Sequence, residues 1–202
     1  MQVLRILAFS DVHGDQLLID RIKQIAKDCD LVLCCGDITP AHGKTMDAGR
    51  RIGKLGARVL AVPGNFELPN DMSIVCKELG WTDLHGKNFE INGIVFAGCG
   101  GGNKGPFNTP YELSEQEFND ILAKLDTSRQ FILVTHCPPK GCVDEPRQGL
   151  HAGSEVIRNF VVEKQPMIQF CGHIHEGGGK EATLGNTRVI NVARQVKLID
   201  VK

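Results

Sequence analysis

The sequence predicts an α/β fold in which two mixed β-sheets are flanked by helices. Short apolar runs rich in β-branched residues alternate with amphipathic stretches of helical length, which is typical of βαβ units. The end of the chain instead carries short strand-like runs separated by a tight turn. No linker, internal repeat or low-complexity segment divides the chain, so we expect residues 1–202 to form a single domain.

Six apolar runs are the expected strands, at residues 3–9, 31–35, 58–62, 94–98, 131–135 and 168–171. Their near-continuous hydrophobicity is typical of strands that are covered on both faces. Five helices are expected between them, at residues 15–29, 43–55, 71–79, 114–125 and 154–163. Ser114 followed by Glu117 forms a capping-box sequence, which marks the start of the fourth helix.

Two tight turns predict antiparallel strand pairs. Asn92-Gly93 would join strands at 89–91 and 94–97, and Gly185-Asn186 would join strands at 180–184 and 187–193. Residues 195–201 are expected to follow as the next consecutive antiparallel strand. A parallel front half with an antiparallel tail favours two mixed sheets with helices outside.

Charge and composition exclude several classes of protein. The chain has 23 Lys and Arg against 24 Asp and Glu and no run of like charges, which argues against binding to nucleic acid or to an anionic membrane. No apolar run approaches the roughly 18 residues of a membrane span. None of the eight cysteines forms a CxxC pair and several lie inside apolar runs, so we expect reduced thiols in a cytoplasmic protein without a membrane segment.

Metal-type side chains follow five of the expected strands. They are Asp11 and His13, Asp37, Asn65, His136, and His173 with His175. Ligands of open α/β sheets bind at the carboxyl ends of the strands, so these side chains are expected to meet. Oxygen and nitrogen donors without thiolates suit Mn, Fe, Ni, Co or Zn. Seven donors are too many for one tetrahedral ion, but they suit two ions about 3.5 to 4 Å apart that activate a bridging water for phosphoester hydrolysis.

Each of these residues alone has an ordinary explanation. Gly36-Asp37 is also a turn sequence, and Asp11 could cap the helix that follows it. His173 and His175 could be alternating strand residues with one face in the core. The recurrence of such residues at five strand ends favours the metal site.

The ordered set Asp11-x-His13, Gly36-Asp37, Gly64-Asn65, His136 and Gly172-His173-x-His175 resembles the calcineurin-like metallophosphoesterase superfamily. In size and motif style the chain is most similar to the small single-domain phosphoesterases related to cyclic-nucleotide phosphodiesterases. The resemblance implies a four-layer α/β/β/α sandwich and two divalent metal ions, with Mn as the first choice. It also implies that one ion is held by Asp11, His13 and His175, the other by Asn65, His136 and His173, and that Asp37 bridges them.

The sequence departs from the family pattern at two places. The family commonly has Gly-Asn-His-Asp/Glu, whose histidine assists the leaving group or holds the phosphate, but this chain has Phe66 at the histidine position. In the second motif, Gly-Asp-x-x-Asp-Arg, Pro40 replaces the second aspartate. Phenylalanine cannot donate a proton, and general-acid help is worth roughly 10² to 10⁴ in rate. Either the leaving group needs little protonation, or another group such as His42 or His151 substitutes.

We therefore predict a metal-dependent phosphoester hydrolase that acts on a small phosphodiester through a bridging hydroxide. Its expected catalytic residues are Asp37, Asn65, His136 and His151, the last in the loop at 142–151. The alternative is a metal-binding protein-interaction scaffold with little or no hydrolytic activity, as in the retromer subunit that resembles this family. A nuclease is disfavoured by the near-zero net charge. The sequence leaves the physiological substrate and the oligomeric state open.

Overall fold

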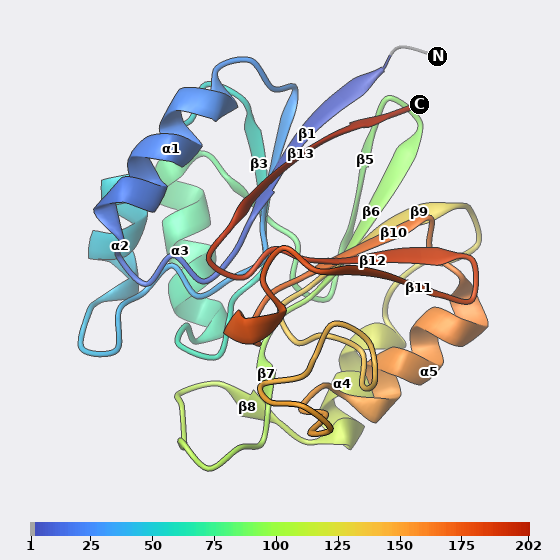
Figure 1. The fold of residues 1–202 in the computed structure, drawn as a ribbon. Helices are drawn as coiled ribbons and strands as arrows, with labels where there is room; N and C mark the ends of the chain where they lie inside the picture. Colours follow the sequence, from blue (N-terminus) through green and yellow to red (C-terminus); the bar gives the residue numbers. More distant parts are fainter. Residues whose placement is uncertain (1–2) are drawn as a thin grey trace.

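Two large sheets lie face to face, and helices cover the outer face of each (Figure 1). The structure is a computed structural model that describes residues 3–202. Its order of layers is helices, sheet, sheet, helices, which is the predicted four-layer α/β/β/α sandwich of two mixed sheets.

The first sheet, which we call the N-terminal sheet, has the strand order β13-β1-β2-β3-β4. Its strands are β1 (Leu4–Phe9), β2 (Leu31–Cys34), β3 (Arg58–Ala61), β4 (Thr82–Asp83) and β13 (Val196–Val201). Strands β1 to β4 run parallel, and β13 is antiparallel to β1. Helices α1 (Gln16–Ala26), α2 (Thr45–Ile52) and α3 (Pro69–Leu79) cover its outer face.

The second sheet, the C-terminal sheet, has the order β11-β12-β10-β9-β6-β5. Its strands are β5 (Asn88–Ile91), β6 (Ile94–Cys99), β9 (Phe131–Thr135), β10 (Ile168–Cys171), β11 (Glu181–Leu184) and β12 (Thr187–Asn191). Helices α4 (Glu115–Leu122) and α5 (Glu155–Lys164) cover it. Short strands β7 (Gly102–Asn103) and β8 (Glu112–Leu113) pair with each other, and the 3₁₀ turn η1 spans His175–Gly177.

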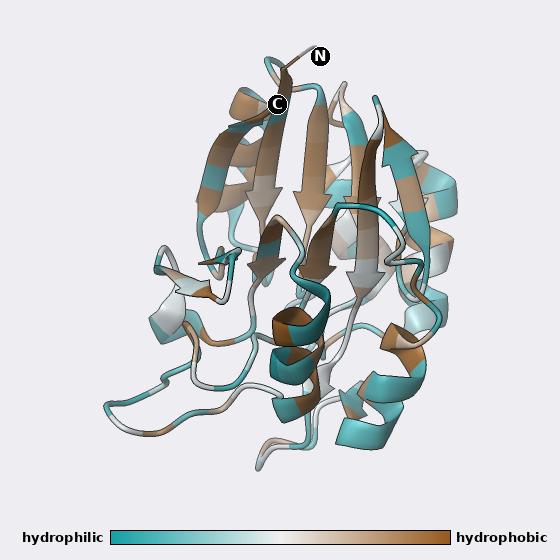
Figure 2. Cartoon of the chain, turned by 90° about the vertical axis from the view of Figure 1, so that its right-hand side faces the viewer, coloured by the Kyte–Doolittle hydropathy of each residue, from teal (hydrophilic) through white to brown (hydrophobic). Residues whose placement is uncertain are grey.

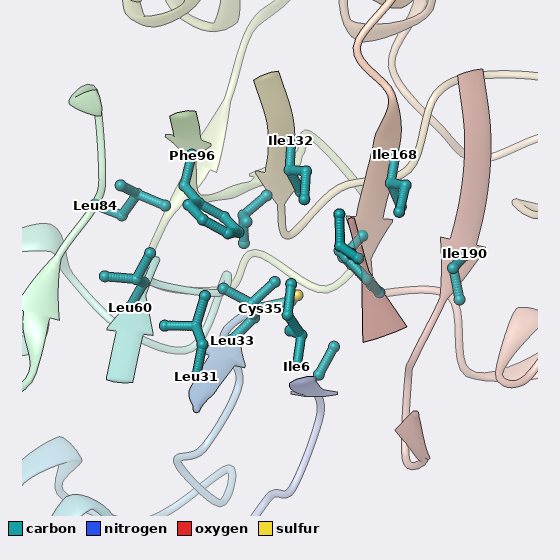
Figure 3. Packing of buried hydrophobic residues seen from close by; sticks show 14 of the residues in the cluster. Ile6, Leu31, Leu33, Cys35, Leu60, Leu84, Phe96, Ile132, Ile168 and Ile190 are labelled. Atoms are coloured by element: carbon teal, nitrogen blue, oxygen red, sulfur yellow. The ribbon is translucent and has the colours of Figure 1, made fainter. Parts of the chain in front are cut away.

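Alternating strand residues fill separate cores on the two faces of each sheet. Ile6 and Leu33 of the N-terminal sheet meet Phe96 and Ile132 of the C-terminal sheet in the core between the sheets (Figure 3). Intervening residues such as Phe9 pack outward against the helices. Figure 2 shows the result: the strands are largely apolar, whereas the helices carry apolar and polar residues in alternation. Because both faces of the strands are covered, the predicted strands read as apolar runs.

The predicted start of the first helix and the predicted capping box are confirmed. The Asp15 carboxylate accepts hydrogen bonds from the N–H groups of Leu17 and Leu18 at the start of α1. Asp11 is therefore not the cap of this helix. At α4, the Ser114 hydroxyl accepts from the N–H of Glu117, whose carboxylate accepts from the N–H of Ser114.

The prediction for the end of the chain is wrong in one respect. The hairpin at Gly185-Asn186 forms, but residues 196–201 do not continue as an antiparallel neighbour of β12. Instead β12 is parallel to β10, and the chain crosses to the other sheet, where β13 pairs with β1 (Figure 1). Arg194 adopts a left-handed conformation with φ +53° at this crossing. Pairing along β1 gives the strand a full-length antiparallel partner, and β13 becomes the edge strand of the N-terminal sheet.

Three two-residue strands, β4, β7 and β8, were too short to produce a periodic signal. Within residues 3–202, no helix is long and apolar enough to cross a membrane.

Candidate metal centre

All seven predicted ligands lie just beyond strand ends at one edge of the sandwich. Asp11 and His13 follow β1, Asp37 follows β2 and Asn65 follows β3, all in the N-terminal sheet. His136 follows β9 and the pair His173 and His175 follows β10, both in the C-terminal sheet. The ladder continues past the strands, since Asp11 N–H donates to Gly36 O and Gly172 N–H donates to His136 O. Both sheets therefore deliver ligands to the same place.

One group of donors is formed by Asp11, His13 and His175. Asp11 Oδ1 lies 3.2 Å from His175 Nε2 and 3.9 Å from His13 Nε2. All three donor atoms lie within 4.8 Å of one another. The family resemblance implies these same three residues as the holders of one ion.

A second group is formed by Asn65, His136 and His173. Asn65 Oδ1 lies 2.8 Å from His136 Nε2 and 2.9 Å from His173 Nδ1. The rings of the two histidines lie with their centroids 5.0 Å apart. Asp37 lies between the two groups, because its Oδ2 is 3.5 Å from His13 Nε2 and 3.5 Å from His136 Nε2. A carboxylate in this position can reach an ion on either side.

The site has a buried inner part and an outer rim, formed by His13, His173 and His175, that is more open to solvent. Asp11, Asp37, Asn65 and His136 are buried, whereas His13 and His173 are half-buried and His175 is exposed. A substrate can therefore approach from the side of the three rim histidines.

Several ligands have strained backbones. Asp11, His13, Asp37 and His173 have φ angles between +43° and +68°, the left-handed region that non-glycine residues seldom adopt. Such strain persists where the surroundings hold it in place, and it concentrates at functional sites. The left-handed backbone turns these four side chains toward one another immediately after their strands. The sequence analysis did not predict this conformation.

Close packing of the strand ends requires glycine at Gly172. A Cβ there would overlap Ser10 Oγ and Asp11 Oδ2. The N–H of His173 donates to the same Asp11 oxygen, at 2.9 Å. Gly172 thus allows the His173-x-His175 turn to lie directly on a ligand carboxylate.

Burial perturbs the proton affinities of the ligands. Burial raises the pKa of Asp37 well above its usual range, and the negative charges of Glu67 and Asp11 raise it further. Burial is the largest single influence on Asp11 and acts in the same direction, but the hydrogen bond with His175 and the charges of His136 and His175 together outweigh it, so the pKa of Asp11 falls below its usual range. Desolvation lowers the pKa of His173 to about 3, which keeps the ring neutral at neutral pH.

The donor set fits divalent metal ions. Asp11 and Asp37 are 0% and 2% exposed, and in the described part of the chain their only ion-pair partners are histidines. Buried carboxylates need a cation nearby. The outer ring nitrogens of two histidines are held by backbone carbonyls: His136 Nδ1 lies 2.8 Å from Cys35 O, and His13 Nδ1 lies 3.0 Å from Thr39 O. Their Nε2 atoms therefore face the cluster, as in metal-ligating histidines.

Comparison with known proteins identifies the family. Residues 4–177 match the family model described as calcineurin-like phosphoesterase. The chain belongs to the calcineurin-like phosphoesterases. It is similar to the uncharacterized protein MJ1162 of Methanocaldococcus jannaschii, with 33% identity over 201 residues that cover 95% of this chain and 88% of that protein.

The solved structures that this phosphoesterase resembles share its fold. TT1561 of Thermus thermophilus has a TM-score of 0.72 and 18% identity, with all of both chains covered. A hypothetical protein from the same organism has a TM-score of 0.58 and 14% identity, covering 94% of this chain and 76% of that one. Together with the donor set, the family supports a metal-dependent phosphoesterase.

Glu67 is a site residue that the sequence analysis did not assign. In this phosphoesterase its buried carboxylate accepts three backbone hydrogen bonds, from Asp37 N–H and Gly64 N–H at 2.8 Å and from Thr39 N–H at 2.9 Å. It joins the loops that carry Asp37 and Asn65, and Thr39 in turn contacts His13. The acidic residue at the end of the Gly64-Asn65-Phe66-Glu67 motif could have indicated a role in the site. Its hydrogen-bond partners, however, are set by tertiary packing.

The candidates for proton donation lie outside the donor groups. Phe66 packs edge-on against His13, with ring centroids 5.1 Å apart. His42 is exposed on the loop before α2. His151 lies on the loop between β9 and α5, where its Nδ1 is 2.8 Å from an oxygen of the buried Asp144. Within residues 3–202, His151 makes no hydrogen bond to any of the seven ligands, so the structure does not join it to the metal centre directly.

Proposed function

We propose that this protein is a phosphodiesterase that uses two divalent metal ions, with manganese as the first candidate. In this proposal Asp11, His13 and His175 hold one ion and Asn65, His136 and His173 hold the other. The observation that carries the proposal is the position of Asp37, whose Oδ2 is 3.5 Å from one histidine of each group. One carboxylate oxygen between two donor groups is the arrangement required for a bridging ligand.

When bound, the two ions would supply a bridging water acidic enough to attack phosphorus as hydroxide, together with positive charge for the phosphate oxygens. The protein's own residues hold the geometry. The carboxylates of Asp37 and Asp11 supply negative charge in the buried part of the site. Asn65 Oδ1 contacts both His136 and His173 and so holds the two rings in place. The half-buried His13 and exposed His175 leave the outer side open to a small phosphodiester.

We further propose that His151 protonates the leaving group in place of the histidine that Phe66 replaces. Its support is the Asp144 carboxylate, which contacts His151 Nδ1 and accepts N–H bonds from Gly141 and Gly153. The ring is held through Nδ1, its Nε2 lies 3.7 Å from Glu145 Oε1, and 40% of the His151 side chain is exposed. Its loop is joined to the turn that bears His173 through Asn191, whose Nδ2 donates both to Val143 O and to Ile174 O.

The test is hydrolysis of bis(p-nitrophenyl) phosphate and p-nitrophenyl phosphate by metal-free protein after addition of Mn, Fe, Co, Ni or Zn. We expect metal-dependent turnover that favours the diester and is lost in His173→Ala. Leu17→Ala, at an 83% exposed position on α1, serves as a control and should retain activity. Faster turnover of the monoester would refute the phosphodiesterase assignment, and full activity of His173→Ala would refute the site.

A protein-interaction scaffold is the second candidate, and the specific observation in its favour is Phe66 at the position of a proton donor. Metal binding that is lost in His173→Ala, without turnover of either ester, would support the scaffold.

We also propose a cytoplasmic location, because the chain carries eight free thiols, seven of them buried.

A further inference from the structure

A groove of about 450 Å³ opens beside the metal ligands, at the start of helices α2 and α3. Its apolar lining consists of Met46, Phe66, Leu68, Ile74 and Pro110. The volume lies within the roughly 300 to 1,000 Å³ of pockets that hold small molecules.

The groove adjoins the candidate metal centre through Phe66. Phe66 directly follows the ligand Asn65, its N–H donates to Asp37 Oδ1 at 2.9 Å, and its ring lies against that of His13. Pro110, which also lines the groove, precedes Tyr111, whose N–H donates to Asn65 O at 2.9 Å. A phosphate at the predicted ligands would therefore lie beside the groove.

The chemistry of the lining favours an uncharged, apolar occupant. Leu68 and Ile74 are 46% and 49% exposed, so apolar surface remains open to water along the groove. The charged lining consists of Lys44 and Asp71, one of each sign, which leaves no net charge to attract a second phosphate. Met46 adds a flexible side chain that can adapt to the shape of a ligand.

We propose that this groove binds an apolar ester arm of the substrate, so that the enzyme acts on phosphodiesters with one apolar arm. The inference rests on the proposed function. Phe66 cannot donate a proton, so the arm along it is the one retained after hydrolysis. Water adds to phosphorus, the P–O bond to the other arm breaks, and that arm leaves with its electron pair and takes up a proton. The product is a phosphomonoester whose apolar arm stays in the groove.

The experiment uses the full-length, manganese-loaded protein and a series of alkyl p-nitrophenyl phosphates with methyl, butyl and hexyl arms. Each methylene buried from water is worth about a two- to fourfold gain, so kcat/KM should rise steeply from methyl to hexyl. Ile74→Asp, and independently Leu68→Asp, should flatten this rise, since both residues are half exposed and tolerate a polar side chain. Leu17→Asp, at an 83% exposed position on α1 outside the groove, is the matched control and should keep the rise.

A binding measurement provides a readout without turnover. Calorimetric titration of the manganese-loaded protein with butyl and hexyl phosphate should show tighter binding of the longer product, and Ile74→Asp should remove the difference. Metal-dependent turnover with rates and affinities independent of arm length would overturn the groove while leaving the phosphodiesterase intact. Absence of turnover for every ester would refute the proposed function instead, and the affinities of the alkyl phosphates would then decide the groove alone.

Discussion

Replacing Glu67 by Gln should destabilise the protein more than a Glu→Gln substitution at an exposed position. The Glu67 carboxylate accepts three backbone N–H groups in a fully buried position. Glutamine has one acceptor oxygen, so it can serve Asp37 and Gly64 N–H but turns its NH₂ group toward Thr39 N–H. One buried donor is then left without an acceptor.

The size of the effect follows from these contacts. A hydrogen bond to a charged acceptor is worth about 1.5 to 3 kcal/mol and a neutral one about 1 kcal/mol, while an unsatisfied buried donor costs about 1 to 3 kcal/mol. Loss of the charge also relieves repulsion with Asp37, whose pKa Glu67 raises. We expect a net loss of about 3 kcal/mol in the free energy of unfolding, or roughly 6 to 12 °C in Tm for a chain of this size. Manganese affinity should fall about tenfold, because outer residues that position ligands have effects of about 10 to 100-fold.

The assay is urea unfolding of metal-free protein, followed by manganese titration of the folded variants. Glu115→Gln is a matched control, since Glu115 also accepts two backbone N–H groups, from Glu155 and Val156, but it is exposed and water can replace it. Its loss of stability should be smaller and its metal affinity unchanged. Equal unfolding midpoints for the two variants would refute the role assigned to the buried carboxylate.

Three further outcomes are expected. Phe66→His should raise the hydrolysis of phenyl phosphate, whose leaving group needs protonation, by up to about 10²-fold; an unchanged rate would mean that protonation by this position is not limiting. Gly172→Ala should weaken manganese binding in a titration, because its Cβ would overlap Ser10 Oγ and Asp11 Oδ2, and wild-type affinity would contradict that geometry. Burial lowers the pKa of His85 to about 4. The unfolded chain, with an ordinary pKa near 6.5, then binds more protons below that pH, so stability should fall by about 3 kcal/mol from pH 7 to pH 4. Urea unfolding should show a shallower fall for His85→Gln, and an equal slope would exclude this cause.

In the proposed reaction, the groove beside Phe66 binds the retained arm and the loop that carries His151 supplies the proton for the leaving arm. The two features belong to different halves of the sandwich. The groove is built from segments that follow β2 and β3, together with Pro110, whereas His151 follows β9. A retained arm on one side and a leaving arm on the other agree with the open rim formed by His13, His173 and His175.

The sequence by itself determined the fold class and predicted a set of metal ligands. Strands covered on both faces must be apolar throughout, so β1, β2, β3, β6, β9 and β10 are visible as uninterrupted runs. The predicted ligands are visible for the same reason, since polar residues such as Asp37 and His136 follow soon after apolar strands. Local hydrogen bonding also made the capping box at Ser114 predictable.

Only the tertiary structure decided how these pieces meet. The pairing of β13 with β1 joins residues at opposite ends of the chain, and no local pattern distinguishes that pairing from one with β12. The three donors to Glu67 come from two different loops, and the left-handed backbone of Asp11, His13, Asp37 and His173 is held by the packing around it. The groove, likewise, exists only where the starts of α2 and α3 lie beside the loop that carries Pro110. Local sequence specifies periodicity and residue chemistry, whereas contacts between distant segments depend on the energy of the whole packed chain.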